Sequence, residues 1–329
     1  MTKKEIRALA KNCGIDLVGF TTCGRLEQKL PESVRPSQIS EYLPVFMVLA
    51  RHIPAGISAA ADGSAKQMAA AIVHRVLEEA AAELAYGLEE KEYLAVVLPS
   101  LIMDFKGRDE LSNAPAGQAS LYLRLAAVEA GLGTLGLNNM LLTREFGPRV
   151  YLCGMMTNLD VEPDEPLQND LCLGLEDCGR CASVCPGDAI PRQSRLGAPL
   201  ADYRDLDGRA CAEYSQPHGV EAFVDHFRSV FRQDDPTGVR SKINSSDTLL
   251  LWYNMAVLRQ GAFTGCSRCL QVCPVGIDYE SIQVSPHRQR DLPVGLRSQI
   301  SAENVSILLG NPAACRGHKT DGVSKGENR

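Results

Sequence analysis

Two short cysteine motifs of identical spacing constrain this chain more than any other feature. Both read C-x2-C-x3-C-P, and they are Cys178-Gly-Arg-Cys181-Ala-Ser-Val-Cys185-Pro186 and Cys266-Ser-Arg-Cys269-Leu-Gln-Val-Cys273-Pro274. Eight of the twelve cysteines in the 329 residues fall between positions 172 and 273. A chain of this length does not need disulfide staples, and a cytoplasmic compartment keeps thiols reduced. The clustering therefore favours metal binding over a disulfide framework.

The spacing predicts two [4Fe-4S] clusters. In bacterial ferredoxins a C-x2-C-x2-C-x3-C-P run supplies three thiolates to one cluster, and the cysteine before proline binds the other cluster. Neither motif here has the usual leading cysteine, but Cys172 precedes the first motif and Cys211 lies far ahead of the second. If the ferredoxin exchange holds, the two ligand sets are Cys172, Cys178, Cys181 and Cys273, and Cys211, Cys266, Cys269 and Cys185. A pair of zinc sites is the alternative, because C-x2-C also suits zinc.

The other four cysteines have no such spacing. We expect Cys13, Cys23, Cys153 and Cys315 to be buried or idle thiols. Cys153 is the conceivable substitute for Cys172, whose five-residue spacer to Cys178 is longer than the usual two.

Charge and hydropathy exclude several classes of protein. The chain has 34 basic and 40 acidic side chains and a net charge of -6, so it has no basic stripe to hold a phosphate backbone. Its longest apolar runs, such as 43–50, fall far short of the roughly 20 residues that span a membrane. Residues 1–14 have neither the apolar core of a signal peptide nor a twin-arginine pair, which predicts a cytoplasmic protein.

Hydrophobic periodicity predicts an α/β (α+β) fold with three parts. Helices are expected at 3–13, 65–86 and 118–130, and strands at 15–20, 45–50, 93–98 and 150–156. Residues 161–166 read as a linker, which separates a first domain at 1–165 from a second at 166–280. The second domain is expected to be ferredoxin-like, with an insertion that has helices near 220–231 and 248–258. Residues 281–329 form an extension that ends in a loose tail.

A glycine-rich turn follows the helix expected at 118–130. Gly131, Gly133 and Gly136 satisfy G-x-G-x-x-G, but a dinucleotide fingerprint should follow a strand and open a helix. The context therefore argues against a dinucleotide site. A helix C-cap and a tight turn account for Gly131 at least.

The stretch 130–149, the strand after it and the two cysteine motifs together resemble the epoxyqueuosine reductase and reductive dehalogenase superfamily. The resemblance spans roughly residues 1–280. It implies a nitroreductase-like cobalamin-binding domain joined to a double-cluster ferredoxin domain. It also implies a corrinoid held base-off at the domain junction, close to one cluster and without a protein histidine below cobalt.

On this resemblance the glycine-rich turn would lie against the corrinoid. Gly131, Gly133 and Gly136 would let the main chain approach the ring, and Asn138 and Asn139 would offer amide groups to its propionamide rim. The two asparagines also suit a plain turn, because asparagine tolerates left-handed backbone geometry.

The chain departs from the epoxyqueuosine reductases at their proton donor. Those enzymes have an aspartate about a dozen residues before the turn, where this sequence has Gly117 or, on a second alignment, Ser112. The weak candidates that remain are Asp104, Asp109, Glu110 and Tyr122. Only about fifty residues follow the second motif, so the helical-repeat extension of many epoxyqueuosine reductases has no counterpart, and tRNA contact is not supported.

The resemblance predicts a reductase fed by an external electron donor such as ferredoxin or flavodoxin. Two [4Fe-4S] clusters would relay low-potential electrons to the corrinoid, which would reduce a small organic substrate. One alternative is an electron-transfer partner that reduces a corrinoid held on another protein and has no substrate of its own. A second alternative is an iron-sulfur reductase whose first domain binds flavin.

Overall fold

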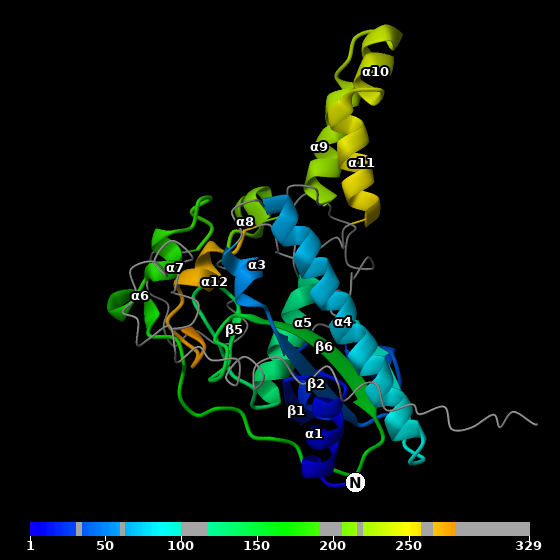
Figure 1. Ribbon diagram of the computed structural model, residues 1–329, viewed down its shortest axis with the longest axis vertical. Coiled ribbons are helices and arrows are strands. Elements are labelled where there is room, and N and C mark those ends of the chain that lie inside the picture. Colours follow the sequence, from blue (N-terminus) through cyan, green and yellow to red (C-terminus); the bar gives the residue numbers. More distant parts are fainter. Residues whose placement is uncertain are drawn as a thin grey trace, which may run out of the picture. The chain divides into compact units, whose positions relative to one another are not determined.

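A four-stranded antiparallel sheet forms the centre of the first half of the chain (Figure 1). The computed structural model describes residues 1–30, 35–59, 63–99, 118–190, 206–215, 220–257 and 266–279. The strand order is β1-β2-β6-β3, with β1 Leu17–Thr22, β2 Val45–His52, β3 Ala95–Leu98 and β6 Val150–Thr157. A small second sheet pairs β4 Thr134–Leu135 with β5 Leu141–Leu142.

The mixture of helix and sheet expected from the sequence is confirmed. All the strand pairs that the structure describes are antiparallel, which corresponds to the α+β form of that expectation. The three helices and four strands expected in the first half are present within three residues of their expected bounds, whereas β4, β5 and the short helical turns were not expected. Contacts divide the chain into two units, residues 1–283 and residues 284–329, and the second unit lies outside the described residues.

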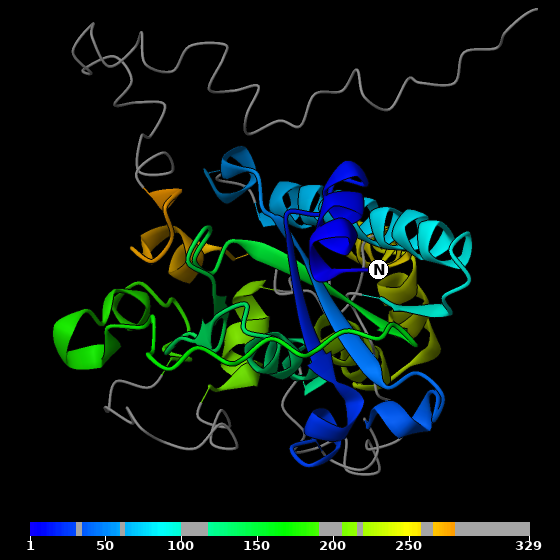
Figure 2. The same cartoon turned by 90° about the horizontal axis from the view of Figure 1, so that it is seen from below.

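Strand β2 is buried on both faces, which explains its uninterrupted apolar sequence. Its alternate side chains Phe46, Val48 and Ala50 belong to one hydrophobic core, which includes residues of helix α5 Gln118–Glu129. Val45, Met47 and Leu49 belong to a second core with helices α1 Lys3–Asn12 and α4 Gly63–Glu89. Helices therefore cover both faces of the sheet (Figure 2).

Short helices connect these elements and build the second half. In the first half they are α2 Cys23–Glu27, the 3-10 turn η2 Pro36–Gln38 and α3 Ala55–Ala59. Around the cysteine motifs they are α6 Gly174–Asp177, α7 Arg180–Ser183, α8 Gly208–Ser215 and α12 Arg268–Val272.

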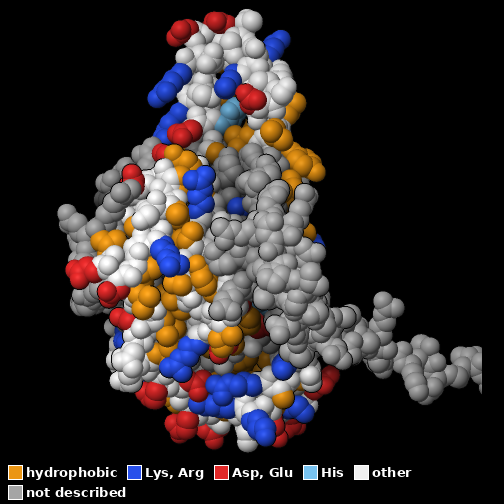
Figure 3. Space-filling model, turned by 60° about the vertical axis from the view of Figure 1, so that its left-hand side comes forward, with side chains coloured by type: hydrophobic (Ala, Val, Ile, Leu, Met, Phe, Trp, Pro, Cys, Tyr) orange, Lys and Arg blue, Asp and Glu red, His pale blue; other side chains and the backbone are white. Residues whose placement is uncertain are grey.

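Three helices in the described part of the insertion after α8 contact one another. They are α9 Val220–Phe231, α10 Pro236–Ile243 and α11 Ser246–Val257. The sequence predicted α9 and α11 but not α10, whose N-cap Asp235 accepts hydrogen bonds from the backbone N–H groups of Thr237 and Gly238. Apolar side chains gather along this insertion below its charged tip, and Phe231 is 81% exposed (Figure 3).

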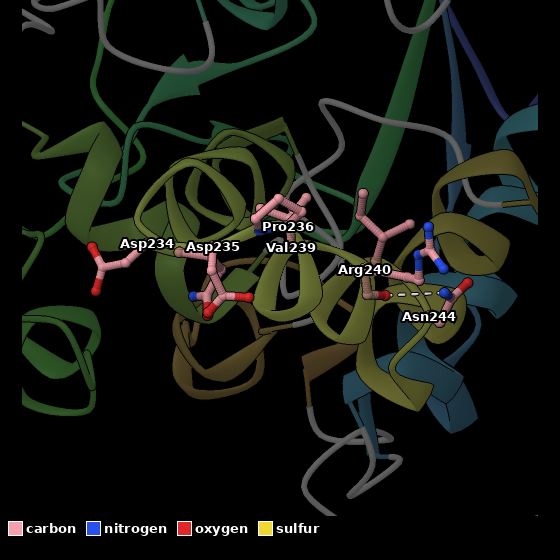
Figure 4. A pocket seen from close by; sticks show the side chains of 8 residues that line it. Asp234, Asp235, Pro236, Val239, Arg240 and Asn244 are labelled. Atoms are coloured by element: carbon pink, nitrogen blue, oxygen red, sulfur yellow. Dashed lines mark hydrogen bonds between the residues drawn. The ribbon is translucent and has the colours of Figure 1, made fainter.

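An open hollow lies at the turn from α9 into α10 (Figure 4). It is lined by residues 233–236, 239, 240, 243 and 244, none of which is a cysteine. The Asn244 side chain donates to the Arg240 carbonyl at 3.0 Å, which closes the end of α10. Of the helices that the structure describes, none has both the length and the apolar character needed to cross a bilayer.

The segment 161–166, expected to be a linker, is fastened to the first half. The Asp164 carboxylate accepts hydrogen bonds from Lys3 Nζ and Arg7 Nη2, both at 2.7 Å, and from the Phe20 backbone N–H at 3.1 Å. The Asp164 backbone N–H donates in turn to the Phe20 carbonyl at 2.8 Å. The Asp164 carboxylate and backbone therefore help to fix the path of the chain from the sheet to the first cysteine motif.

We predict that Asp164→Ala lowers the free energy of unfolding by about 2 kcal/mol, because two charged hydrogen bonds and one backbone hydrogen bond lose their acceptor. Denaturant unfolding of the anaerobically purified protein measures this loss. Glu162→Ala, an exposed carboxylate of the same segment, is the matched control and should change stability by less than about 0.5 kcal/mol. Equal losses in the two variants would contradict the role of Asp164.

Candidate metal and cofactor site

The two cysteine motifs fold into short helical turns that pack against each other. Cys181 lies in α7 and Cys269 in α12, and these two helices are in contact. Cys178 follows α6 directly, and Cys273 caps the end of α12. Each of these helices contains one cysteine, and the other two cysteines of its motif lie within two residues of its ends.

One group of thiols surrounds Cys181. Burial raises the pKa of the Cys181 thiol to about 11, and the negative charge of nearby sulfurs contributes to the rise. Those sulfurs belong to Cys172, Cys273 and Cys178. Burial also raises the pKa of Cys273, with Cys172 and Cys178 again contributing. We call Cys172, Cys178, Cys181 and Cys273 the Cys172 group.

A second group of thiols surrounds Cys211, which lies in α8. Burial raises the pKa of the Cys211 thiol to about 11, and Cys185 and Cys266 contribute to the rise. Burial also raises the pKa of Cys269 well above its usual value, and the nearby sulfurs that contribute are, in decreasing order, Cys211, Cys266, Cys181 and Cys185. We call Cys185, Cys211, Cys266 and Cys269 the Cys211 group.

The two groups cross between the motifs. Cys273 of the second motif lies with the first motif's cysteines, and Cys185 of the first lies with the second motif's. The groups are neighbours, because the Cys181 sulfur also contributes to the raised pKa of Cys269. Among the described residues, no three or more His, Cys, Asp or Glu side chains are placed around a single metal-ion position. Sulfur donors of this kind suit iron-sulfur clusters and zinc.

Packing inside the protein accounts for the glycines of the glycine-rich turn. Gly131 ends α5 with a φ of 69°, and a Cβ there would lie 2.5 Å from the Glu165 carbonyl oxygen. A Cβ on Gly133 would collide with the Leu142 carbonyl of β5, and one on Gly136 would lie 2.8 Å from Asn138 Oδ1. Their predicted contact with a corrinoid ring stays a prediction.

Asn138 and Asn139 carry buried polar atoms without a hydrogen-bond partner among the residues that the structure describes. Asn138 is 4% exposed, and its Oδ1 accepts from the Met140 backbone N–H, while its Nδ2 has no hydrogen-bond partner. Asn139 has a φ of 56°, as expected for a turn residue, but its buried Oδ1 is also without a partner. Leaving such groups unsatisfied costs about 1–3 kcal/mol each, so both atoms suit a ligand that offers amides.

The remaining candidates divide into those that the structure describes and those that it does not. Cys153 is buried in β6 with its Sγ 3.1 Å from the Leu98 carbonyl, inside the hydrophobic core. Cys23 contacts the Leu43 carbonyl through its Sγ at 3.1 Å. Tyr122 lies in α5, but its side chain is not described. Asp104, Asp109, Glu110 and Cys315 lie outside the described residues.

Arg149 is a site residue that the sequence analysis missed. Its side chain is fully buried at the end of the stretch 130–149. Its guanidinium binds the Asp278 carboxylate through Nε at 2.8 Å and Nη2 at 2.5 Å. It also donates to the carbonyls of Leu270, Cys273 and Val275, at distances between 2.7 and 3.1 Å.

The backbone just before Arg149 is hydrogen-bonded to the same loop, which follows the second motif. The Ile277 and Asp278 backbone N–H groups donate to the carbonyls of Arg144 and Glu145, at 3.1 and 3.2 Å. Gly147 has a φ of 53°, and any Cβ there would collide with the Val275 carbonyl. The Gly-Pro-Arg sequence could have drawn attention to this turn, but no local pattern links it to residues about 130 positions later.

Comparisons with known proteins identify two kinds of relative. The chain is 31% identical over 129 residues to an epoxyqueuosine reductase from Lactococcus garvieae, which is 38% of this chain and 30% of that protein. It is 26% identical over 219 residues to the epoxyqueuosine reductase of Bacillus subtilis, covering 60% of this chain and 53% of that one. It is 31% identical over 115 residues to a tetrachloroethene reductive dehalogenase from Desulfitobacterium hafniense, covering 35% and 20%.

These relatives confirm the resemblance to the epoxyqueuosine reductase and reductive dehalogenase superfamily. The chain spans between a fifth and about half of the length of these three proteins. No protein-family model matches it.

Solved structures of both families are also similar. A selenomethionine-labelled epoxyqueuosine reductase has a TM-score of 0.48 and 22% identity, covering 83% of this chain and 65% of that one. A reductive dehalogenase described as B12-dependent has a TM-score of 0.44 and 20% identity, covering 80% and 36%.

We predict that Arg149→Met lowers the free energy of unfolding by about 3–5 kcal/mol, because it leaves the Asp278 carboxylate and three carbonyls without their donor. Denaturant unfolding of the anaerobically purified protein measures the loss. The Arg149→Met/Asp278→Asn double variant should recover part of it, because the unpaired carboxylate is gone.

The matched control is Arg228→Gln, which breaks the exposed Arg228–Asp225 pair of α9. It should cost about 0.5 kcal/mol or less. A loss in Arg149→Met no larger than in this control would show that the buried guanidinium does not hold the second motif.

Proposed function

We propose that this relative of the epoxyqueuosine reductases and reductive dehalogenases is a reductase that binds two [4Fe-4S] clusters and a corrinoid. The crossed grouping of eight cysteine thiols is the observation that carries the proposal. This exchange of one cysteine between the motifs is the arrangement of two-cluster ferredoxins.

The Cys172 group and the Cys211 group would each hold one cluster. When bound, the clusters would supply one-electron transfer, and the corrinoid would supply the reducing metal. The chain buries the sulfurs and donates hydrogen bonds to them, and both factors tune the cluster potential. The Ala189 backbone N–H lies 3.3 Å from Cys185 Sγ, and Ser215 Oγ lies 3.8 Å from Cys211 Sγ.

Asn138 and Asn139 would bind the amide rim of the corrinoid. The support is the pair of unsatisfied atoms, since Asn138 Nδ2 is a donor and Asn139 Oδ1 is an acceptor. A propionamide has both a carbonyl and an NH2 group, so it complements both atoms. The proposed substrate is a small organic molecule, and the proposed electron donor is a low-potential carrier such as ferredoxin or flavodoxin.

The crossed ligand sets predict opposite outcomes for two double variants. Cys178→Ala/Cys273→Ala alters only the Cys172 group and should leave roughly four irons per chain. Cys178→Ala/Cys185→Ala alters both groups and should leave few or none. Iron and acid-labile sulfide assays on anaerobically reconstituted protein measure both.

Cys23→Ala is the control for these assays, and it should keep about eight irons per chain. The assignment is wrong if the first double variant loses all its iron while the second retains one cluster. That outcome would mean that each motif binds its own cluster.

Corrinoid binding is tested by adding hydroxocobalamin to anaerobically purified protein. We expect a base-off cobalt(II) signal in the EPR spectrum of the reduced complex. Asn138→Ala should weaken binding about five- to tenfold, the value of one or two hydrogen bonds. Asn244→Ala, an exposed asparagine of the insertion, is the control and should bind normally.

Two outcomes would contradict the corrinoid. Protein that keeps its iron and binds no hydroxocobalamin would instead be an electron-transfer partner for a corrinoid held elsewhere. Protein that is yellow as isolated and releases flavin would be a flavin-dependent iron-sulfur reductase.

A further inference from the structure

A lysine from the first half of the chain is buried beside the Cys211 group. Lys66, in the first turns of α4, is 7% exposed. Its Nζ donates to Ser267 Oγ at 3.0 Å, and Ser267 stands between Cys266 and Arg268 in the second motif. Burial lowers the pKa of Lys66, and the Cys266 sulfur acts in the opposite direction by favouring the charged form. The ammonium group therefore lies within electrostatic range of a Cys211-group sulfur.

A second buried cation approaches the same group from α5. Arg124 is 7% exposed, and its Nη1 donates to the backbone carbonyl of Asn139. Burial lowers the pKa of Arg124 to about 10, while Cys211 favours its charged form. The charge of Arg124 in turn opposes the rise that burial causes in the pKa of the Cys211 thiol. Arg124 thus links the turn that carries the two asparagines to the Cys211 group.

The Cys172 group has a different electrostatic environment. Among the described residues, Arg149 is a buried cation beside it, which donates to the Cys273 carbonyl and opposes the rise that burial causes in the pKa of the Cys273 thiol. Arg149 forms a two-point ion pair with Asp278, so a carboxylate accompanies that charge into the site. The hydrogen bond that anchors Lys66 goes instead to a neutral hydroxyl.

Reduction adds negative charge to a cluster that is already held by four thiolates. A buried cation nearby therefore stabilises the reduced form and raises the reduction potential, and low local dielectric increases the effect. A cation paired with a carboxylate contributes less, because the two charges oppose each other at the cluster.

We propose that Lys66, together with Arg124, raises the reduction potential of the Cys211-group cluster above that of the Cys172-group cluster. This inference rests on the proposed function, because it assumes that both groups bind clusters. Both cations come from the first half of the chain, so folding of that half sets the potential of a cluster held by the second. The electron would pass from the Cys172-group cluster to the Cys211-group cluster. It would then be held beside the turn that contains Asn139. Lys66 is a positioning residue that acts through the cluster.

The experiment is an EPR-monitored redox titration of anaerobically reconstituted protein without corrinoid. In a Cys178→Ala background only the Cys211-group cluster gives a signal, and in a Cys266→Ala background only the Cys172-group cluster does. Lys66→Gln should lower the midpoint potential in the first background and leave it unchanged in the second. Arg124→Gln should act on the same cluster in the same direction.

Three variants distinguish an effect of the Lys66 charge from a purely structural effect of the side chain. Lys66→Arg keeps the charge and should restore the original potential, which a purely structural role would not require. Ser267→Ala removes the anchor of Lys66 and should shift the potential less than Lys66→Gln. Arg268→Gln removes an exposed cation of the same motif, and water should screen its charge, so its shift should be smaller still.

The inference is overturned if Lys66→Gln and Arg124→Gln shift neither cluster or both equally, or if Arg268→Gln matches Lys66→Gln. If Lys66→Gln fails to fold, a lowered potential in Lys66→Arg would overturn it as well. If unaltered protein binds about eight irons but no corrinoid, the corrinoid proposal is wrong. The inference about Lys66 is not affected by that result, because these potentials are measured without corrinoid. Unaltered protein that binds fewer irons would overturn both.

Discussion

The buried guanidinium of Arg149 joins the sheet half of the chain to the second cysteine motif. It binds one carboxylate and three backbone carbonyls, all contributed by residues 270–278. Arginine suits this position because its donors form a rigid planar fork that binds several acceptors at once. Cys273 lies inside the loop that Arg149 holds and contributes to the Cys172 group, while Cys266 and Cys269 of the same motif contribute to the Cys211 group. Placing this loop therefore positions sulfurs of both groups.

The crossing of the thiols makes the two motifs interdependent. Neither motif supplies four sulfurs, and each group needs one cysteine from the other motif and one from outside both. The sulfurs are also partly or fully buried, which raises the pKa of several of them and favours neutral thiols when no metal is bound. Formation of the proposed clusters would therefore remove protons from buried sites, and the positive charges of Lys66, Arg124 and Arg149 would favour that change.

Local patterns in the sequence were sufficient for most elements of the first half. The apolar run of β2, the long helix α4 and the end of α5 at Gly131 follow from periodicity and from glycine geometry. Helix α10 was missed because it has no apolar stripe and begins from the Asp235-Pro236 cap. Segment 161–166 looked like a free linker, but its Asp164 pairs with residues about 160 positions earlier.

The site was only partly predictable, because several of its contacts join residues that are far apart in the sequence. The cluster ligand sets that the cysteine spacing predicts, read against ferredoxins, stay predictions. The contacts of Arg149 with Asp278 and of Lys66 with Ser267 join residues 129 and 201 positions apart. Hydrophobic periodicity along the sequence does not predict such pairs. Carbonyls of Glu165 and Leu142 approach Gly131 and Gly133 closely and explain these glycines, and their predicted contact with a cofactor stays a prediction. Local sequence indicates that a turn needs glycine but not what approaches it.

The most direct measurement is a crystal structure of the anaerobically purified protein with anomalous diffraction recorded at the iron edge. The account predicts two cube-sized iron peaks, one bounded by Cys172, Cys178, Cys181 and Cys273 and the other by Cys185, Cys211, Cys266 and Cys269. Single-ion peaks at the zinc edge would contradict it, and so would an iron cube bounded by Cys178, Cys181 and Cys185 together.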